Sequence, residues 1–141
     1  MKAQIKILLL ILTVSVAACS NNLYSDKETN NLQGSWELRN IKGGFRQPNS
    51  PSDFEPGNGT IIKFDGDKFE MTDRKSTPVR TGTYSVINEP KVINGQEIAQ
   101  KVVYTEETGQ NSQHFKLSGN KLILYVGEIA SDGYEATYEK L

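Results

Sequence analysis

Few side chains in this 141-residue sequence stand out as candidates for chemistry: a single cysteine, a single histidine and a small group of carboxylates. The histidine, His114, would need a nucleophile or an orienting carboxylate within reach to act as a general base. The sequence contains no Gly-x-Ser-x-Gly motif and no second histidine. The residues around His114 alternate so that it lies opposite Phe115 and faces solvent. We therefore expect that the protein is not an enzyme.

The carboxylates of Asp65, Asp67 and Glu70 have a spacing similar to the beginning of a calcium-binding loop. An EF-hand loop is longer and ends in a bidentate glutamate. In this sequence Phe69 and Met71 resume an apolar alternation at once, so Asp-Gly-Asp predicts the tight turn of a β-hairpin. One cysteine and one histidine also cannot form a Cys/His zinc site. We expect neither a metal site nor a cofactor.

The first residues, 1–18, have the composition of an export signal. Lys2 and Lys6 precede an apolar run from Ile7 to Val16. A helix that spans a bilayer needs about 20 apolar residues, and this run is shorter. The segment therefore predicts a signal peptide that is cleaved rather than a transmembrane helix.

Cys19 directly follows the small residues Ala17 and Ala18. This arrangement resembles the lipobox of bacterial lipoproteins. The resemblance implies that signal peptidase II cuts before Cys19, whose thiol and new amine then carry acyl chains that insert into the lipid bilayer. Ser20, in place of an aspartate, implies by the same resemblance an anchor in the outer membrane of a Gram-negative cell envelope. A secretory signal with an incidental cysteine is the alternative.

The segment 19–31 comprises the lipidated cysteine and a polar, aperiodic stretch that predicts a flexible tether. The remaining residues, 32–141, are enough for one domain. The chain has 16 basic and 17 acidic residues, and its formal net charge is −1. Without a basic excess to neutralise phosphates, nucleic acid is excluded as a partner. We expect a monomer.

The domain 32–141 has the pattern of an all-β fold. Short alternating segments rich in β-branched and aromatic residues are separated by turns that contain glycine, and no helical spacing persists. All connections except the first are short enough for hairpins. An eight-stranded antiparallel up-and-down meander hides its edges by closing into a β-barrel, with a β-sandwich as the alternative. The predicted strands are 34–41, 59–65, 68–74, 80–87, 97–105, 112–117, 121–126 and 134–140.

The beginning of the first predicted strand, Gly34-Ser35-Trp36, resembles the Gly-x-Trp opening of the lipocalin superfamily. Gly82-Thr83-Tyr84 and the terminal Tyr138-Glu139-Lys140-Leu141 resemble segments of short bacterial lipocalin-like lipoproteins. The resemblance implies a lipocalin-like barrel with Trp36 at its closed end. Lys140 is then either a cation–π partner of Trp36 or a solvated side chain. The sequence lacks the Thr-Asp-Tyr turn and the disulfide of larger lipocalins.

A set of mostly aromatic residues lies in phase with the apolar faces of the predicted strands and forms the candidate lining of a cavity. Rings with hydroxyl groups around a small cavity suit an apolar ligand with a few polar groups. The alternative is a filled core. The candidates are Phe64, Phe69, Met71, Tyr84, Tyr104, Phe115 and Tyr138.

The long connection 43–58 contains three of the five prolines and is typical of a functional loop. An exposed phenylalanine costs free energy, so we expect Phe45 and Phe54 to fold back onto the mouth of the barrel. Phe45, Arg46 and Phe54 would then form a lid over a ligand or a plug in a solid barrel.

Two functions remain open at this stage. A membrane-anchored envelope lipoprotein with a lipocalin-like barrel could bind a small hydrophobic ligand. The alternative is a protein-interaction module of the cell envelope, with a solid barrel and an inhibitor-like or structural role. For this alternative, the acidic charge and the exposed pair Glu106-Glu107 are compatible with a basic protein partner.

Overall fold

The computed structural model describes residues 32–45, 50–73 and 75–141. Within these residues, no helix is long and apolar enough to cross a membrane. Cys19 and the segments 1–18 and 19–31 lie outside the described residues. The elements in chain order are β1 (Gly34–Gly43), β2 (Ile61–Asp65), β3 (Lys68–Thr72), β4 (Pro78–Ile93), β5 (Gln96–Glu106), β6 (Gly109–Ser118), β7 (Lys121–Val126), the 3₁₀ turn η1 (Ile129–Ser131) and β8 (Tyr134–Lys140).

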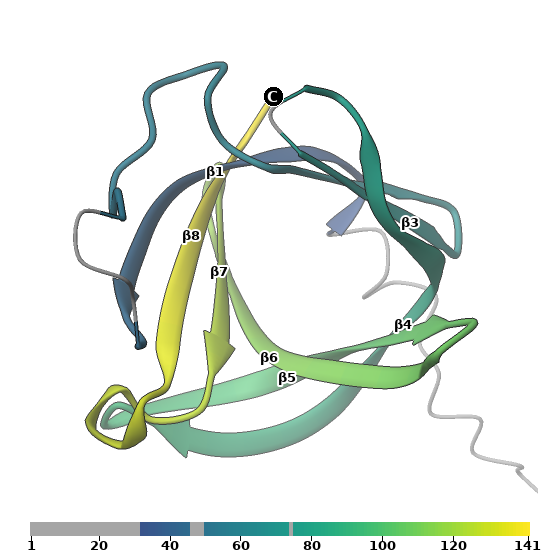
Figure 1. The fold of residues 1–141 in the computed structure, drawn as a ribbon. Helices are drawn as coiled ribbons and strands as arrows, with labels where there is room; N and C mark the ends of the chain where they lie inside the picture. The colour runs from purple at the N-terminus through teal and green to yellow at the C-terminus, as the bar shows by residue number, and fades with distance from the viewer. Residues whose placement is uncertain (1–31, 46–49, 74) are drawn as a thin grey trace, which may run out of the picture.

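The eight strands form one closed antiparallel barrel, in which each strand pairs with its neighbours in the sequence and β8 returns to β1 (Figure 1). The closing register places Leu38 opposite Tyr138 and Ile41 opposite Ala136. Closure leaves neither β1 nor β8 as an unpaired edge. The predicted eight-stranded up-and-down barrel is confirmed, and the alternative β-sandwich is wrong. The Asp-Gly-Asp segment forms the predicted hairpin between β2 and β3, with Asp65 opposite Lys68.

The β4–β5 hairpin is longer than its sequence pattern indicates. β4 continues to Ile93 and β5 starts at Gln96, whereas the patterns predicted 80–87 and 97–105. The difference arises at Pro90, which suggests the end of a strand because proline has no N–H to donate. The register shifts between Asn88 and Lys91, so Pro90 lies in an irregularity of the ladder, where proline is tolerated.

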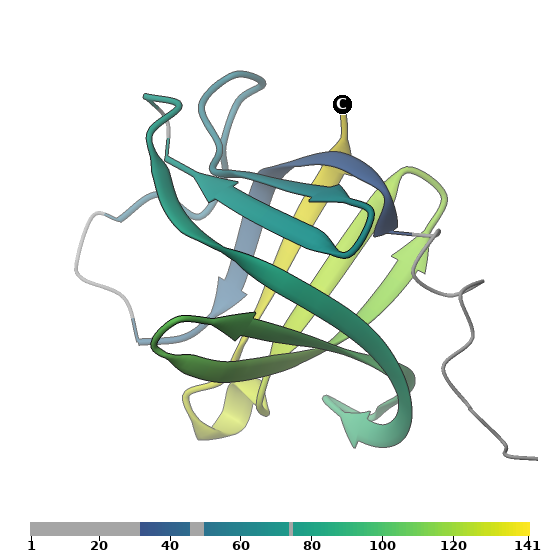
Figure 2. The same cartoon turned by 90° about the vertical axis from the view of Figure 1, so that its right-hand side faces the viewer.

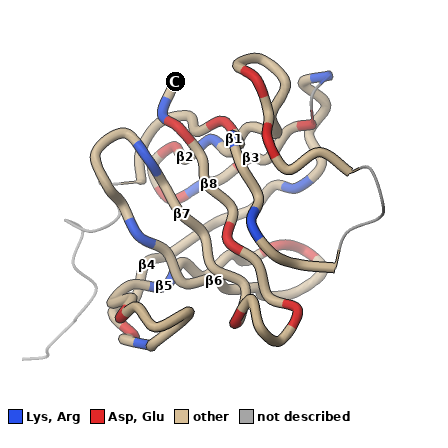
Figure 3. Tube along the Cα trace, turned by 90° about the vertical axis from the view of Figure 1, so that its left-hand side faces the viewer, with Lys and Arg blue, Asp and Glu red and all other residues tan. Residues whose placement is uncertain are grey.

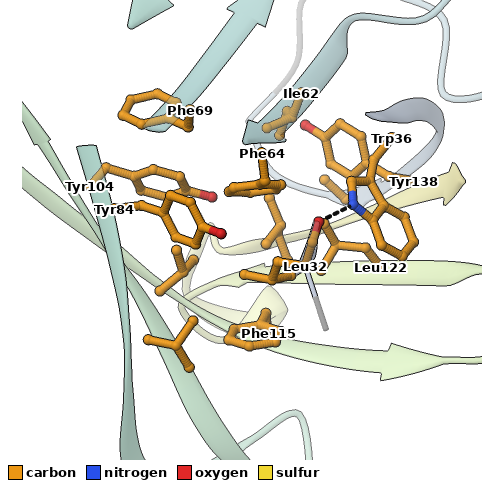
Figure 4. Packing of buried hydrophobic residues seen from close by; sticks show 14 of the residues in the cluster. Leu32, Trp36, Ile62, Phe64, Phe69, Tyr84, Tyr104, Phe115, Leu122 and Tyr138 are labelled. Atoms are coloured by element: carbon orange, nitrogen blue, oxygen red, sulfur yellow. Dashed lines mark hydrogen bonds between the residues drawn. The ribbon is translucent and has the colours of Figure 1, made fainter. Parts of the chain in front are cut away.

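Trp36 closes one end of the barrel. Its side chain is buried, and its indole Nε1 donates a hydrogen bond of 2.7 Å to the carbonyl oxygen of Leu32. The Nζ atom of Lys140 lies 5.2 Å from the centroid of the Trp36 ring. The cation–π alternative for Lys140 is therefore confirmed, and this end of the barrel is filled by side chains (Figure 4).

Beyond its irregularity, the β4–β5 hairpin curves away from the barrel axis, as the long strand β4 shows in Figure 2. Its residues Ile93 and Ile98 form a second, smaller apolar cluster with Tyr125 of β7. Tyr125 pairs with His114 on the outer face of the barrel. The prediction that His114 faces solvent is wrong: it is 7% exposed, and its Nε2 lies 3.0 Å from the Glu89 carbonyl oxygen. The alternation of residues along β6 correctly predicted that His114 lies on the outer face of the barrel, but the β4–β5 hairpin covers that face.

Asn94, at the tip of this hairpin, links the hairpin by hydrogen bonds to the β7–β8 connection and to β8. Its backbone N–H donates to Oε2 of Glu128 at 2.7 Å, and its Nδ2 donates to Oε1 of Glu135 at 2.8 Å. Its Oδ1 accepts a hydrogen bond of 2.9 Å from the backbone N–H of Ile129.

On the face of the barrel seen in Figure 3, basic and acidic residues are interspersed.

Candidate functional site

A cavity of about 440 Å³ lies against the inner faces of two paired strands, β1 from Leu38 to Gly43 and β8 from Tyr134 to Tyr138. This volume lies within the range of small-molecule sites, roughly 300–1,000 Å³. Its apolar wall comes from inward-facing residues that pair across the two strands. The lining residues are Leu38, Ile41, Gly43, Gly44, Phe45, Asp132, Tyr134, Ala136 and Tyr138. The cavity lies at the end of the barrel opposite Trp36, because β1 runs away from Trp36 towards Gly43.

Of the predicted cavity residues, Tyr138 lines this cavity. The others belong to the packed core, in which Met71 is half-buried and the rest are buried: Phe64, Phe69, Tyr84, Tyr104 and Phe115. The alternation thus placed the whole set on the inner face. Strand periodicity does not determine which parts of the inner face are packed and which are hollow. That depends on how the aromatic rings of different strands pack against one another.

The packed aromatic residues meet mainly edge to face (Figure 4). The ring centroids of Phe64 and Tyr84 are 4.7 Å apart with an interplanar angle of 65°, and those of Phe69 and Tyr104 are 4.8 Å apart with an angle of 64°. Such geometry adds to the stabilisation from burial alone. These contacts fix the ring of Tyr104, so its hydroxyl has a defined position inside the barrel.

Two of the three residues of the predicted lid, Phe45 and Phe54, are described by the structure. Phe54 is half-buried and packs against the core, as predicted. Its backbone N–H donates to the Arg39 carbonyl oxygen at 2.8 Å, which holds this part of the loop on β1. Phe45 is 94% exposed, so the prediction that its ring folds back onto the barrel is wrong. Gly43 and Gly44 adopt positive φ angles of 80° and 79°, and they turn the chain before Phe45. Arg46 lies outside the described residues.

Glu37 holds the other end of the same loop. Its side chain points outward from β1 but is buried, and it accepts a hydrogen bond of 3.0 Å from the Gly59 N–H. Nη1 of Arg39 lies 2.6 Å from its Oε2. Burial raises the pKa of Glu37, but the Gly59 N–H and Arg39 outweigh it and hold the pKa below the usual range. A Cβ atom at Gly59 would lie 2.0 Å from the Leu38 carbonyl oxygen, so only glycine fits this approach.

An ion pair that sequence reasoning missed lies on the inner wall of β4 and β5. Arg80 pairs with Met71 and shares its face, which points into the barrel. Its Nε lies 3.2 Å from both carboxylate oxygens of Glu106. The hydrogen bond to Glu106 raises the pKa of Arg80, and the same bond lowers the pKa of Glu106. The prediction that Glu106 is exposed is wrong, because the side chain is half-buried against Arg80.

Arg80 also covers two aromatic rings. Its guanidinium carbon lies 5.9 Å from the centroid of Phe69 and 5.6 Å from that of Tyr104, distances that allow cation–π attraction. A sequence signal for this position existed, since Arg80 is in phase with Gly82 and Tyr84 on the inner face. The strand pattern of 80–87 does not indicate which residue neutralises a charge in that phase.

Tyr104 carries a buried hydroxyl group that has no hydrogen-bond partner in the structure described. The residue is 1% exposed. Burial raises its pKa, so the phenol keeps its proton at neutral pH. By contrast, the hydroxyl of Tyr84 accepts a hydrogen bond of 2.7 Å from Nε2 of Gln33. A buried polar group without a partner costs about 1–3 kcal/mol, so this hydroxyl lowers the stability of the folded barrel.

Tyr138 faces Tyr104 from the other side of the barrel, and both hydroxyl groups point into the interior in Figure 4. Burial raises the pKa of Tyr138, and Arg80 is near enough to oppose that rise. The ion pair of β4 and β5 lines a different hollow from the cavity against β1 and β8, and of the two tyrosines only Tyr138 lines that cavity.

Comparison with known proteins supplies no function that could be transferred to this chain. No protein-family model, curated protein or solved structure matches it. The closed eight-stranded barrel is compatible with a lipocalin-like fold. The residues of the barrel interior must therefore carry the functional argument.

Proposed function

We propose that the protein binds a small, largely apolar molecule in the open end of its barrel. The observation that carries this proposal is the cavity of about 440 Å³ against the inner faces of β1 and β8, in a barrel whose other end is filled. We further propose that Cys19 carries acyl chains, and that they hold the protein at the outer membrane of a Gram-negative envelope. The lipobox-like sequence Ala17-Ala18-Cys19 supports this part.

The uneven packing of the barrel supports a binding role. Trp36, Phe64 and Phe115 are each 1% exposed and fill the interior from the closed end. Burial of these rings stabilises the barrel without help from a ligand. The walls of the cavity are therefore held in place before anything binds, and a preformed site loses little conformational entropy on binding.

The same observations weigh against the two other classes of function. A protein-interaction module with a solid barrel would not need the cavity. The carboxylate of Glu106, which was expected to face a basic protein partner, is instead paired with Arg80 of the same chain. His114 lies on the outer face against the Glu89 carbonyl oxygen, so no general base faces the cavity from this position. A binding protein without catalytic activity remains the function that fits best.

A fluorescence titration tests the proposed function. The full chain is kept soluble with an amphipathic polymer too large to enter the barrel, and the apolar dye 1-N-phenylnaphthylamine is added. We expect saturable binding, with polymer alone as the blank. Ala136→Phe fills the cavity, because Ala136 is on its wall, and should weaken binding at least about tenfold. Ala130→Phe, at an exposed position of η1, is the matched control and should bind the dye like the wild type.

Two outcomes of the dye titration would count against binding in the cavity. Absence of saturable dye binding by the wild type would contradict the proposed function. Equal dye binding by the wild type and Ala136→Phe, with unchanged circular dichroism, would show that the dye binds elsewhere.

A further inference from the structure

We propose that the cavity against β1 and β8 binds amphiphiles with a cationic head, such as long-chain amines, and that Asp132 holds the head at the rim while the alkyl chain lies inside the barrel. This inference rests on the proposed function and adds the chemical class of the ligand. Three features of the cavity lining carry it: the order of apolar and polar residues, one carboxylate without a partner, and aromatic rings at the rim.

The first feature is the order of the lining residues along the two strands. From the barrel interior towards the rim, the paired lining residues are Leu38 with Tyr138, Ile41 with Ala136, and Gly43 with Tyr134. Asp132 lies beyond the last of these pairs, two residues before Tyr134. The strand rises about 13 Å from Tyr138 to Tyr134, since each residue adds about 3.3 Å. An extended alkyl chain can therefore lie along this wall with its polar end at the rim.

The second feature is the carboxylate of Asp132. Of the described residues that line the cavity, only Asp132 is charged. It is exposed, and it makes no hydrogen bond or ion pair with any residue that the structure describes. The backbone beside it is fixed to β1, because the Gly44 N–H donates a hydrogen bond of 2.9 Å to the Gly133 carbonyl oxygen. A cationic head would gain an ion pair here and stay in contact with water, whereas an anionic head would be repelled.

The described lining offers an anionic head no counter-ion. Lys42 belongs to the same part of β1, but in the β1–β8 ladder it lies opposite Glu135, on the outer face of the barrel. Arg80 lines a different hollow, along β4 and β5, and is paired there with Glu106. The charge of the lining therefore favours cations over carboxylates and phosphates.

The third feature is a pair of aromatic side chains, Phe45 and Tyr134, which line the outer part of the cavity together with Asp132. Phe45 follows the turn at Gly43 and Gly44, and its ring is 94% exposed. An ammonium group is attracted to the face of an aromatic ring, and a neutral hydroxyl head lacks this attraction. The rings therefore add to the preference that the carboxylate of Asp132 creates.

Competition against 1-N-phenylnaphthylamine tests the class of ligand. The full chain is held in an uncharged amphipathic polymer, which does not retain ions, and the competitors are decylamine, decan-1-ol and decanoate. These share one chain length and are cationic, neutral and anionic at neutral pH. We expect decylamine to displace the dye, in low salt, at a concentration about fivefold lower than decan-1-ol and about tenfold lower than decanoate.

Equal or weaker binding of decylamine than of decan-1-ol would overturn the inference. The proposed function would stand in that case, provided that the wild type binds the dye and Ala136→Phe weakens this binding.

Asp132→Asn makes the test specific to the carboxylate. Asparagine tolerates the positive φ of 62° at this position, so the substitution removes the charge and keeps the backbone. The preference for decylamine over decan-1-ol, corrected for the dye affinity of each variant, should fall about fivefold. Asp67→Asn, at an exposed position of the β2–β3 turn outside the cavity lining, is the matched control and should keep the wild-type preference. An unchanged preference in Asp132→Asn would overturn the inference.

Salt gives an independent readout of the same contact. Because the carboxylate of Asp132 is exposed, raising sodium chloride from about 20 mM to about 500 mM should screen it and reduce the preference for decylamine over decan-1-ol. A preference that does not change with salt would show that the head group does not bind this carboxylate, and would overturn the inference.

Discussion

Arg80 and Glu106 form an ion pair on the inner wall of the barrel, with Nε of Arg80 3.2 Å from each carboxylate oxygen of Glu106. Strand interiors rarely hold such a pair, because charged residues are seldom buried unless they are partnered. Here each charged group has its partner, and the pair lines a hollow along β4 and β5 that is separate from the cavity against β1 and β8.

The unpaired hydroxyl of Tyr104 leads to a prediction about stability. Tyr104→Phe removes the buried oxygen and keeps the ring contacts with Phe69 and Phe64. The free energy of unfolding without ligand should rise by about 1–3 kcal/mol, since an unsatisfied buried polar group is lost. Urea denaturation measures this change. A decrease in the denaturation midpoint would show that the hydroxyl has a stabilising partner in the folded protein.

Trp36 offers a second test by denaturation. Trp36→Ala should lower the free energy of unfolding by about 3–5 kcal/mol, the usual cost of removing a large buried aromatic side chain. Val79→Ala, at a position that is 54% exposed, is the control and should stay within about 0.5 kcal/mol of the wild type. A midpoint for Trp36→Ala equal to that of the control would mean that Trp36 does not close the barrel.

The pKa of Glu37 predicts how stability depends on pH. This pKa is lower in the folded than in the unfolded protein, so unfolded chains take up protons first as the pH falls. The stabilisation from Glu37 is complete above the ordinary glutamate pKa and is lost as the pH falls through the lowered, folded-state value. The melting temperature should therefore fall on acidification through this range. Glu37→Gln should lower it at neutral pH and flatten the acid dependence, while Glu107→Gln should change neither.

The proposed membrane anchor is tested in cells. Cys19→Ala should abolish membrane attachment and let the uncleaved precursor accumulate, because no thiol is then available to carry the diacylglycerol. Globomycin, an inhibitor of lipoprotein signal peptidase, should cause the same accumulation in the wild type. Fractionation and immunoblotting report both effects. Normal processing of Cys19→Ala would contradict the lipobox interpretation.

The fold could be predicted from the sequence because strand alternation is a local property. The residues around Leu122 and Leu124 alternate so clearly that the predicted strand 121–126 coincides with β7. The β4–β5 hairpin was predicted too short, because Pro90 is a local signal for a break and the irregular pairing that accommodates it depends on β5. His114 was assigned to the correct face but wrongly to solvent, since its cover comes from residues around Ile98.

The candidate site was less predictable for the same physical reason. Alternation showed that Tyr104 and Tyr138 point inward, but packing across the barrel decided that Tyr138 lines a cavity and Tyr104 lies beneath Arg80. Such contacts join strands that are distant in the sequence. The inward phase of Arg80 was visible in the sequence, whereas its partner Glu106 emerges only from the pairing of β4 with β5.

The central claim, that a small, largely apolar molecule binds in the open end of the barrel, is tested most directly by methyl NMR. The full chain carries ¹³C-labelled methyl groups of Ile, Leu and Ala, and decan-1-ol is titrated in. We predict that the methyl signals of Leu38, Ile41 and Ala136 shift together and saturate, because these residues form the cavity wall. Signals of Ile93 and Ile98, in the outer cluster, should stay in place. Shifts confined to that outer cluster, or no saturable shift of the cavity methyls, would contradict the account.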